Sequence, residues 1–64
     1  MVGETIRTYR KRAGLTQEKL AEKADLDHNL IGEVERGNVE MSLGSLLKIA
    51  NALKVRIRDL VGDI

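Results

Sequence analysis

The stretch TQEKLAEKADLDHNLIGEVERG, residues Thr16–Gly37, decides the fold, because it holds two short amphipathic segments with a very short connection between them. The first segment carries an apolar stripe with helical spacing, made of Leu20, Ala21 and Ala24. The second segment repeats this pattern with Ile31 and Val34. Two helices joined by so few residues must cross at a steep angle, so the stretch predicts a helix-turn-helix.

Residues that favour helix ends mark both boundaries of the connection. The Thr16 hydroxyl can cap the first helix, and the Asp27 carboxylate can cap the second. Asp25 lies where the chain must reverse, a position that often needs a positive φ. Asp is one of the few residues besides Gly that tolerate such a φ.

The same reading extends over the whole chain and predicts an all-α fold in a single domain, residues 1–64. We expect five helices, at about Val2–Ala13, Gln17–Ala24, His28–Arg36, Leu43–Leu53 and Ile57–Val61. Gly14 and Gly37 should end the first and third helices, and Ser42 should cap the fourth. In the first helix the residues expected to face inward are Ile6, Arg10 and Ala13. In the fourth helix the expected apolar stripe is Leu43, Leu46, Leu47, Ala50 and Leu53.

The composition excludes several classes of function. The 64 residues include no Cys and one His, so neither a disulfide framework nor a metal site is expected. No nucleophile–His–acid constellation indicates an enzyme, and we expect no cofactor and no small-molecule ligand. No apolar run could span a membrane, and the N-terminus lacks the apolar segment of a signal peptide, so a cytoplasmic protein is expected.

Three stretches carry a resemblance to a known family: GLTQEKLAEKA (Gly14–Ala24), the I-x-x-x-E-R-G run (Ile31–Gly37) and SLGSLLKIANALKV (Ser42–Val55). They resemble the lambda-repressor/Cro-like (XRE) helix-turn-helix domains of bacteria and phages. The resemblance implies a compact five-helix lambda-repressor-like fold, with the helix-turn-helix at about residues 17–36. It also implies a transcriptional regulator that binds double-stranded DNA in a sequence-specific manner, with the helix at about 28–36 in the major groove.

Candidate DNA contacts follow from that resemblance. The residues expected to read bases are His28, Asn29, Gly32 and Glu33, and those expected to bind phosphates are Thr16, Gln17, Arg36 and Asn38. Asn can bind adenine N6 and N7, a His can donate to guanine, and Glu can accept from cytosine N4. The alternative for each polar residue is an ordinary solvent-facing position. Gly32 inside a helix indicates close approach, either to a base pair or to the preceding helix.

The distribution of charge along the chain is the feature that least favours DNA binding. Residues 25–41 hold five acidic side chains and one basic one, although the whole chain has a net charge of +1. Phosphate neutralisation supplies most of the affinity for duplex DNA. The resemblance implies that Glu35 forms a structural ion pair with Arg10 and so does not face the groove. The helix dipole partly neutralises Asp27 as a cap.

The last ten residues contain more apolar side chains than a small core needs. We expect a homodimer interface made of Val55, Ile57, Leu60, Val61 and Ile64. A two-fold dimer implies a pseudo-palindromic operator with half-sites about 34–36 Å apart.

Two classes of function stay open at this stage. The first is the DNA-binding regulator, and the stretch LDHNLIGEVERGNVEMSL also resembles the controller proteins of restriction–modification systems. Phage repressors and antitoxin-type regulators are nearly as similar. The second is a protein-interaction module on the same fold, whose acidic third helix would bind a basic partner.

Overall fold

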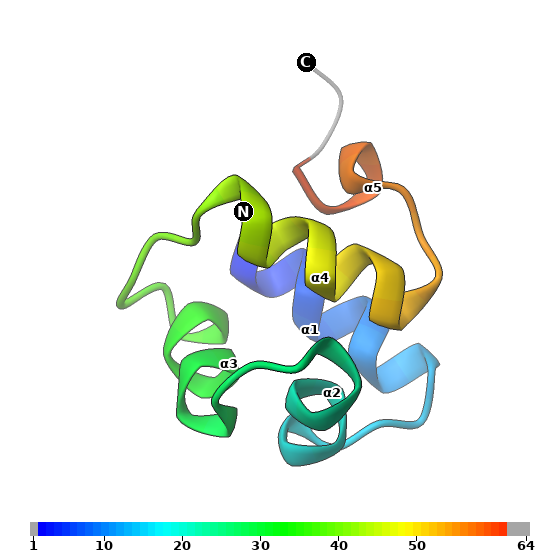
Figure 1. The fold of residues 1–64 in the computed structure, drawn as a ribbon, viewed down its shortest axis with the longest axis horizontal. Coiled ribbons are helices and arrows are strands. Elements are labelled where there is room, and N and C mark those ends of the chain that lie inside the picture. Colours follow the sequence, from blue (N-terminus) through cyan, green and yellow to red (C-terminus); the bar gives the residue numbers. More distant parts are fainter. Residues whose placement is uncertain (1, 62–64) are drawn as a thin grey trace.

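The computed structural model describes residues 2–61, and these form five helices and no strand (Figure 1). The helices are α1 (Val2–Arg12), α2 (Gln17–Ala24), α3 (His28–Glu35), α4 (Leu43–Leu53) and α5 (Ile57–Val61). Each predicted helix is present, and its observed ends lie within one residue of the predicted ones. The all-α prediction is therefore confirmed.

The helices are arranged so that α2 and α3 form one end of the molecule and α5 lies at the other (Figure 1). α2 packs against α3 and α4, while α1 packs against α3 and α5. The three residues Asp25–Asp27 connect α2 to α3, as the helix-turn-helix prediction required. One face of α3 is left uncovered by this arrangement.

Each helix contributes one residue to the centre of the core. The five largest fully buried side chains are Ile6, Leu20, Ile31, Ile49 and Leu60, and each has 0% of its surface exposed. Smaller residues such as Ala21 and Ala24 fill the space between α2 and its neighbours. Burying an aliphatic side chain of this size contributes about 1.5–3 kcal/mol. Removing any one helix would therefore expose the central buried side chains of the other helices to solvent.

Side-chain caps begin three of the helices, as predicted. Thr16 Oγ1 accepts from the Lys19 N–H at 3.0 Å, and Asp27 Oδ1 accepts from the Asn29 N–H at 2.9 Å. Ser42 Oγ accepts from the Ser45 N–H at 3.2 Å. These bonds satisfy N–H groups that the helix itself cannot pair.

Left-handed residues end the helices. Asp25 has φ 57° and ψ 47°, which confirms the predicted positive φ at the turn. Gly14 and Gly37 also have positive φ, at 73° and 77°. Lys54 adopts φ 59° after α4. This positive φ was not predicted, because position 54 is neither Gly nor Asn.

The start of α5 is capped in a different way. Arg56 stands where a capping Ser or Asp is common in the family, and its side chain cannot accept a hydrogen bond. Instead, Asp59 Oδ2 accepts from the Arg56 backbone N–H at 3.0 Å. This is the returning half of a capping box, supplied by the third residue of the helix.

Two predictions about inward-facing residues are wrong. Leu43 and Leu47 are 65% and 46% exposed, because α4 turns Ile49 toward the core together with the predicted Ala50 and Leu53. At 100° per residue, Leu43 and Leu47 lie roughly 70° and 110° around the helix from that direction, where no neighbouring helix covers them. Ala13 follows the end of α1 and is also exposed.

α1 and α3 approach very closely at Gly3. A Cβ atom on Gly3 would overlap with the backbone carbonyl oxygen of Val34. The start of α1 can therefore pack against the end of α3 only because residue 3 has no side chain. This contact holds the end of α3 beside the polar groups of α1.

Candidate nucleic-acid interface

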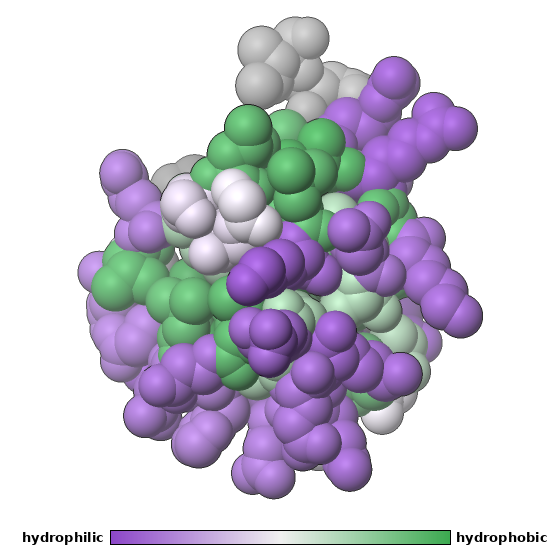
Figure 2. All heavy atoms as spheres, viewed as in Figure 1, coloured by the Kyte–Doolittle hydropathy of each residue, from purple (hydrophilic) through white to green (hydrophobic). Residues whose placement is uncertain are grey.

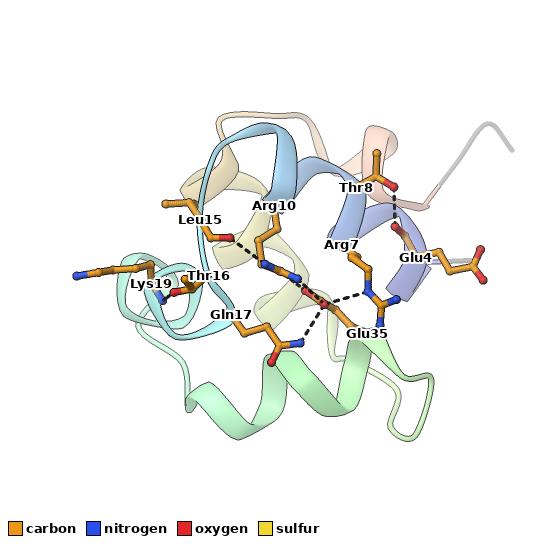
Figure 3. Close-up of polar contacts among 9 residues, drawn as sticks. All are labelled: Glu4, Arg7, Thr8, Arg10, Leu15, Thr16, Gln17, Lys19 and Glu35. Carbon is orange, nitrogen blue, oxygen red and sulfur yellow. Dashed lines mark hydrogen bonds and ion pairs between the residues drawn. The ribbon is translucent and has the colours of Figure 1, made fainter.

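The inner end of α3 is fixed by an ion pair at Glu35. Arg10 Nε donates to Glu35 Oε2 at 2.6 Å and Arg10 Nη2 donates to Glu35 Oε1 at 3.1 Å (Figure 3). The structure thus brings together the two residues predicted to pair. The Glu35 side chain has no exposed surface and that of Arg10 is only 11% exposed. This two-pronged geometry is the strongest that Arg and a carboxylate can form.

Three further groups complete the cluster. Gln17 Nε2 and Arg7 Nε both donate to Glu35 Oε1, at 3.1 and 3.3 Å, and Arg10 Nη1 donates to the Leu15 carbonyl at 2.8 Å (Figure 3). Arg7 was not among the residues predicted from the sequence. Its position three residues before Arg10, on the same face of the first helix, was the available signal. The cluster links α1, the start of α2 and the end of α3.

The carboxylate form of Glu35 is stabilised by these donors. Burial on its own raises the pKa of this carboxyl group, but the hydrogen bonds from Arg10 and Gln17 and the charge of Arg10 outweigh burial. The net result is a pKa below the ordinary value of 4.5. Among residues 2–61, no buried side-chain nitrogen or oxygen lacks a hydrogen-bond partner.

The outer face of α3 is polar and open to solvent. His28 and Asn29 form its first turn and are exposed. They lie beside the start of α2, and the two helices share an open depression lined by Gln17, Glu18, His28, Asn29, Gly32 and Arg36. Four of the residues predicted to contact DNA from α3 and its end, together with Gln17, therefore lie around one depression.

Gly32 lies at the crossing of α2 and α3. A Cβ atom there would come within 3.3 Å of Arg36 Nη1 and 3.4 Å of Gln17 Oε1. Of the two reasons proposed for a Gly in this helix, the structure shows the approach to α2. The approach to a base pair stays a prediction.

Glu33 is held by two neighbours. Arg36 Nη2 donates to Glu33 Oε1 at 2.5 Å, and Asn38 Nδ2 donates to Glu33 Oε2 at 3.3 Å. The hydrogen bonds from Arg36 and Asn38 and the charge of Arg36 lower the pKa of Glu33, so it is ionised at neutral pH. Both of its oxygens face groups of the same chain.

These contacts account for most of the acidic charge around α3. Glu35 is buried against Arg10, Asp27 caps α3, and Glu33 is paired with Arg36. Of the five acidic residues between positions 25 and 41, only Asp25 and Glu40 remain without such a contact among the described residues. The negative charge on the outer face of α3 is therefore smaller than the number of acidic residues between positions 25 and 41 suggests.

The chain after α3 is used to end that helix. The Gly37 N–H donates to the Val34 carbonyl at 3.0 Å, and the Asn38 N–H donates to the Glu33 carbonyl at 2.9 Å. These bonds form a Schellman-type end. The backbone N–H groups of Gly37 and Asn38 are therefore both used to end α3.

The predicted apolar interface near the C-terminus needs correction. Leu60 is completely buried in the monomer, so its inclusion was wrong, and Ile64 lies outside the described residues. Val55 and Ile57 are half-buried, and Val61 is 36% exposed. Figure 2 shows hydrophobic surface over α4 and α5 and also over the connection from α3 to α4, whereas the lower end of the view, formed by α2 and α3, is mostly hydrophilic. Leu43 and Leu47 supply most of the exposed apolar side chains of α4.

Within residues 2–61, no three His, Cys, Asp or Glu side chains lie close enough together to bind a metal ion. None of the helices described has the length and apolar character needed to cross a bilayer.

Comparison with known proteins agrees with this geometry. The profile of the helix-turn-helix family matches residues 6–60. The immunity repressor protein of Bacillus phage phi105 is 39% identical over 62 residues, covering 97% of this chain. The chain spans only 43% of the length of that repressor.

Two solved structures are similar over most of their length. The restriction–modification controller protein C.AhdI from Aeromonas hydrophila has a TM-score of 0.90 and 42% identity, covering 92% of this chain and 89% of that one. The biofilm regulator SinR, solved in complex with DNA, has a TM-score of 0.94 and 32% identity, covering 97% of this chain and 100% of that one. These relatives are regulators and not enzymes, and they do not favour the protein-interaction alternative. The chain therefore belongs to the XRE-type helix-turn-helix family of DNA-binding transcriptional regulators.

Proposed function

We propose that the chain binds a pseudo-palindromic DNA operator in the cytoplasm as a two-fold homodimer, with α3 of each copy in the major groove. The observation that carries the proposal is the uncovered polar face of α3. Its first turn, with His28 and Asn29, is exposed, while its opposite end is fixed to α1 by Arg10 and Glu35. A helix whose backbone is held from behind can present its side chains to base edges with less loss of backbone conformational entropy on binding.

Base reading is assigned to the first turn of α3. Asn29 can donate to adenine N7 and accept from adenine N6, while His28 can donate to guanine. Thr16 and Gln17 lie at the start of α2, and Asn38 follows the other end of α3; these three residues are assigned to the phosphate backbone. Gln17 is well placed for two tasks, because one amide N–H braces Glu35 and the side chain also lines the depression on the reading face.

The DNA part of the proposal is tested by selection of bound duplexes from a random library, followed by mobility-shift titration. Asn29→Ala should relax the preference at one base pair in each half-site, at a cost of about 1–3 kcal/mol on the selected duplex. Asn51→Ala is the matched control, because Asn51 is exposed on α4, away from the depression. If wild type bound all duplexes alike, or if both variants had the same effect, the proposal would be wrong.

The dimer is assigned to the apolar surface of α4 and α5. Leu43, Leu47 and Val61 expose apolar area there, with Val55 and Ile57 half-buried at its edge. Isolated exposed apolar residues are ordinary, but a gathered patch on one face of a small domain is typical of an interface. This surface lies apart from the α2–α3 end, so a second copy on it would leave both reading helices uncovered.

Sedimentation of Leu47→Asp tests the dimer. The change adds a charge to the apolar surface, and we expect a folded monomer with weakened operator binding. Lys23→Gln makes the same change in net charge at an exposed position of α2, outside this apolar surface, and should leave the assembly unchanged. A wild-type chain that sediments as a monomer at high concentration, with or without operator DNA, would contradict the assignment.

A further inference from the structure

The Arg36 side chain lies over the reading helix and not in the loop that follows it. Arg36 continues the helical backbone with φ −84° and ψ −7°. Side chains on a helix point back toward its N-terminus. The position of the Arg36 guanidinium agrees, because Nη1 and Nη2 lie 3.3 and 3.7 Å from where a Cβ of Gly32 would be. The missing side chain of Gly32 thus makes room for this guanidinium, which lines the depression with His28 and Asn29.

Glu33 holds the guanidinium in this position. Its Oε1 accepts from Arg36 Nη2 at 2.5 Å, and its Oε2 accepts from Asn38 Nδ2 at 3.3 Å. Glu33 is therefore fixed from two sides and in turn fixes Arg36. These two hydrogen bonds compete with any hydrogen bond that Glu33 could accept from a cytosine in the groove.

The remaining donors of Arg36 suit a base edge. Among residues 2–61, Nη2 is the only guanidinium nitrogen of Arg36 that donates a hydrogen bond. A guanidinium carries five N–H donors in a flat fork, and two parallel donors match O6 and N7 of guanine. The adjacent Glu33 carboxylate balances the charge of Arg36, which weakens a purely electrostatic attraction to phosphates. It does not weaken a directed pair of hydrogen bonds to the same degree.

We propose that Arg36 reads a guanine in the major groove, and that Glu33 and Asn38 are positioning residues that hold it over Gly32. This rests on the proposed placement of α3 in the groove. It reassigns Arg36 from phosphate binding to base reading, Asn38 from phosphate binding to positioning, and Glu33 from base reading to positioning. Gly32 contributes to the same specificity, because its missing side chain leaves room in the depression for the Arg36 guanidinium.

The test is selection from a random duplex library with wild type, Arg36→Lys, Glu33→Gln and Gly32→Ala, each followed by titration on selected and scrambled duplexes. Arg36→Lys keeps the positive charge but removes the flat fork. We expect it to lose one guanine preference per half-site and about 10–100-fold in affinity for the selected duplex, with little change on scrambled DNA. Arg56→Lys, an exposed position at the start of α5, is the matched control.

The other two variants separate positioning from mere structure. Glu33→Gln should weaken the same guanine preference while raising affinity for scrambled DNA and steepening its salt dependence by about one phosphate contact, because Arg36 is no longer neutralised. Gly32→Ala should displace the guanidinium and weaken the same preference, although Ala favours a helix and the thermal melt should not fall. In the Arg36→Lys background, neither change should alter that preference further.

Several results would overturn the proposal. Equal losses on selected and scrambled duplexes for Arg36→Lys, with an unchanged selected sequence, would make Arg36 a phosphate contact. Changes at different base pairs for Arg36 and Glu33 variants would make Glu33 an independent reader. A wild-type chain without any sequence preference would overturn the proposed function as well, and this outcome is distinct from the first two.

Discussion

Removal of the buried cation Arg10 is the perturbation that most directly tests how α3 is held. Arg10→Met keeps an unbranched apolar stem in place of the Arg side chain but removes three hydrogen bonds, two to Glu35 and one to the Leu15 carbonyl. Breaking a buried pair by removing one partner costs about 3–5 kcal/mol, since a charge is left uncompensated. Gln17 and Arg7 still donate to Glu35 in the variant, so we expect about 3 kcal/mol.

The opposite change should cost less. Glu35→Leu leaves Arg10 without its carboxylate, but Arg10 keeps the Leu15 carbonyl and is 11% exposed, whereas the Glu35 side chain is fully buried. We expect about 2 kcal/mol for this variant. The double variant Arg10→Met/Glu35→Leu removes both charges, so it should be more stable than the sum of the two losses predicts.

Urea melts followed by circular dichroism measure these differences. For a domain of this size, a loss of about 3 kcal/mol lowers the Tm by roughly 12–24 °C, which the same spectra can follow on heating. Arg12→Met is the matched control, because Arg12 is exposed on the same helix and its guanidinium lies 5.8 Å from the ring centre of Tyr9. It should cost less than about 1 kcal/mol. The reasoning would be refuted if Arg10→Met cost no more than Arg12→Met, or if the two losses were additive in the double variant.

Three further changes follow from the backbone and from the pKa of Glu35. Gly3→Ala should destabilise the fold by more than about 1 kcal/mol in a urea melt, since its Cβ would overlap with the Val34 carbonyl oxygen; a neutral effect would show that α1 can shift without loss. Asp25→Gly should be neutral or stabilising by up to about 1 kcal/mol, because Asp25 has φ 57°, and a clear loss of stability would point to a role of its side chain instead. Folding depresses the pKa of Glu35, so its stabilising contribution is complete above the unfolded pKa and is lost as the pH falls through the folded one. The difference in stability between wild type and Glu35→Gln should therefore narrow as the pH falls below 4.5, and a constant difference would contradict the assigned pKa shift.

The helices and their ends could be predicted from the sequence because they depend on residues close together along the chain. Caps at Thr16, Asp27 and Ser42 need a partner only two or three residues away. The left-handed turn at Asp25 depends on the backbone preference of one residue. The same locality explains why the boundaries of all five helices were predicted to within one residue.

The pairing of Arg10 with Glu35 has a different origin. The two residues are 25 positions apart, so no local rule joins them, and only the family resemblance indicated the contact. The contribution of Arg7 was missed because its partner also lies on another helix. The proposed role of Arg36 was not predicted for a related reason. The position of its guanidinium depends on Gly32 and Glu33 together and not on any one residue type.

The sequence by itself determined that this chain forms five helices with a helix-turn-helix between the second and third, because periodicity and caps are local properties. Only the tertiary structure decided which apolar residues of the last two helices are buried. α4 is apolar around most of its circumference, so its sequence period could not tell whether Leu47 or Ile49 faces the core. Leu60 likewise could have been an interface or a core residue, and it is buried because α5 packs against both α1 and α4. Which of these side chains is buried depends on how helices that are distant in the sequence pack together in a small core, and no single stretch of sequence specifies that packing.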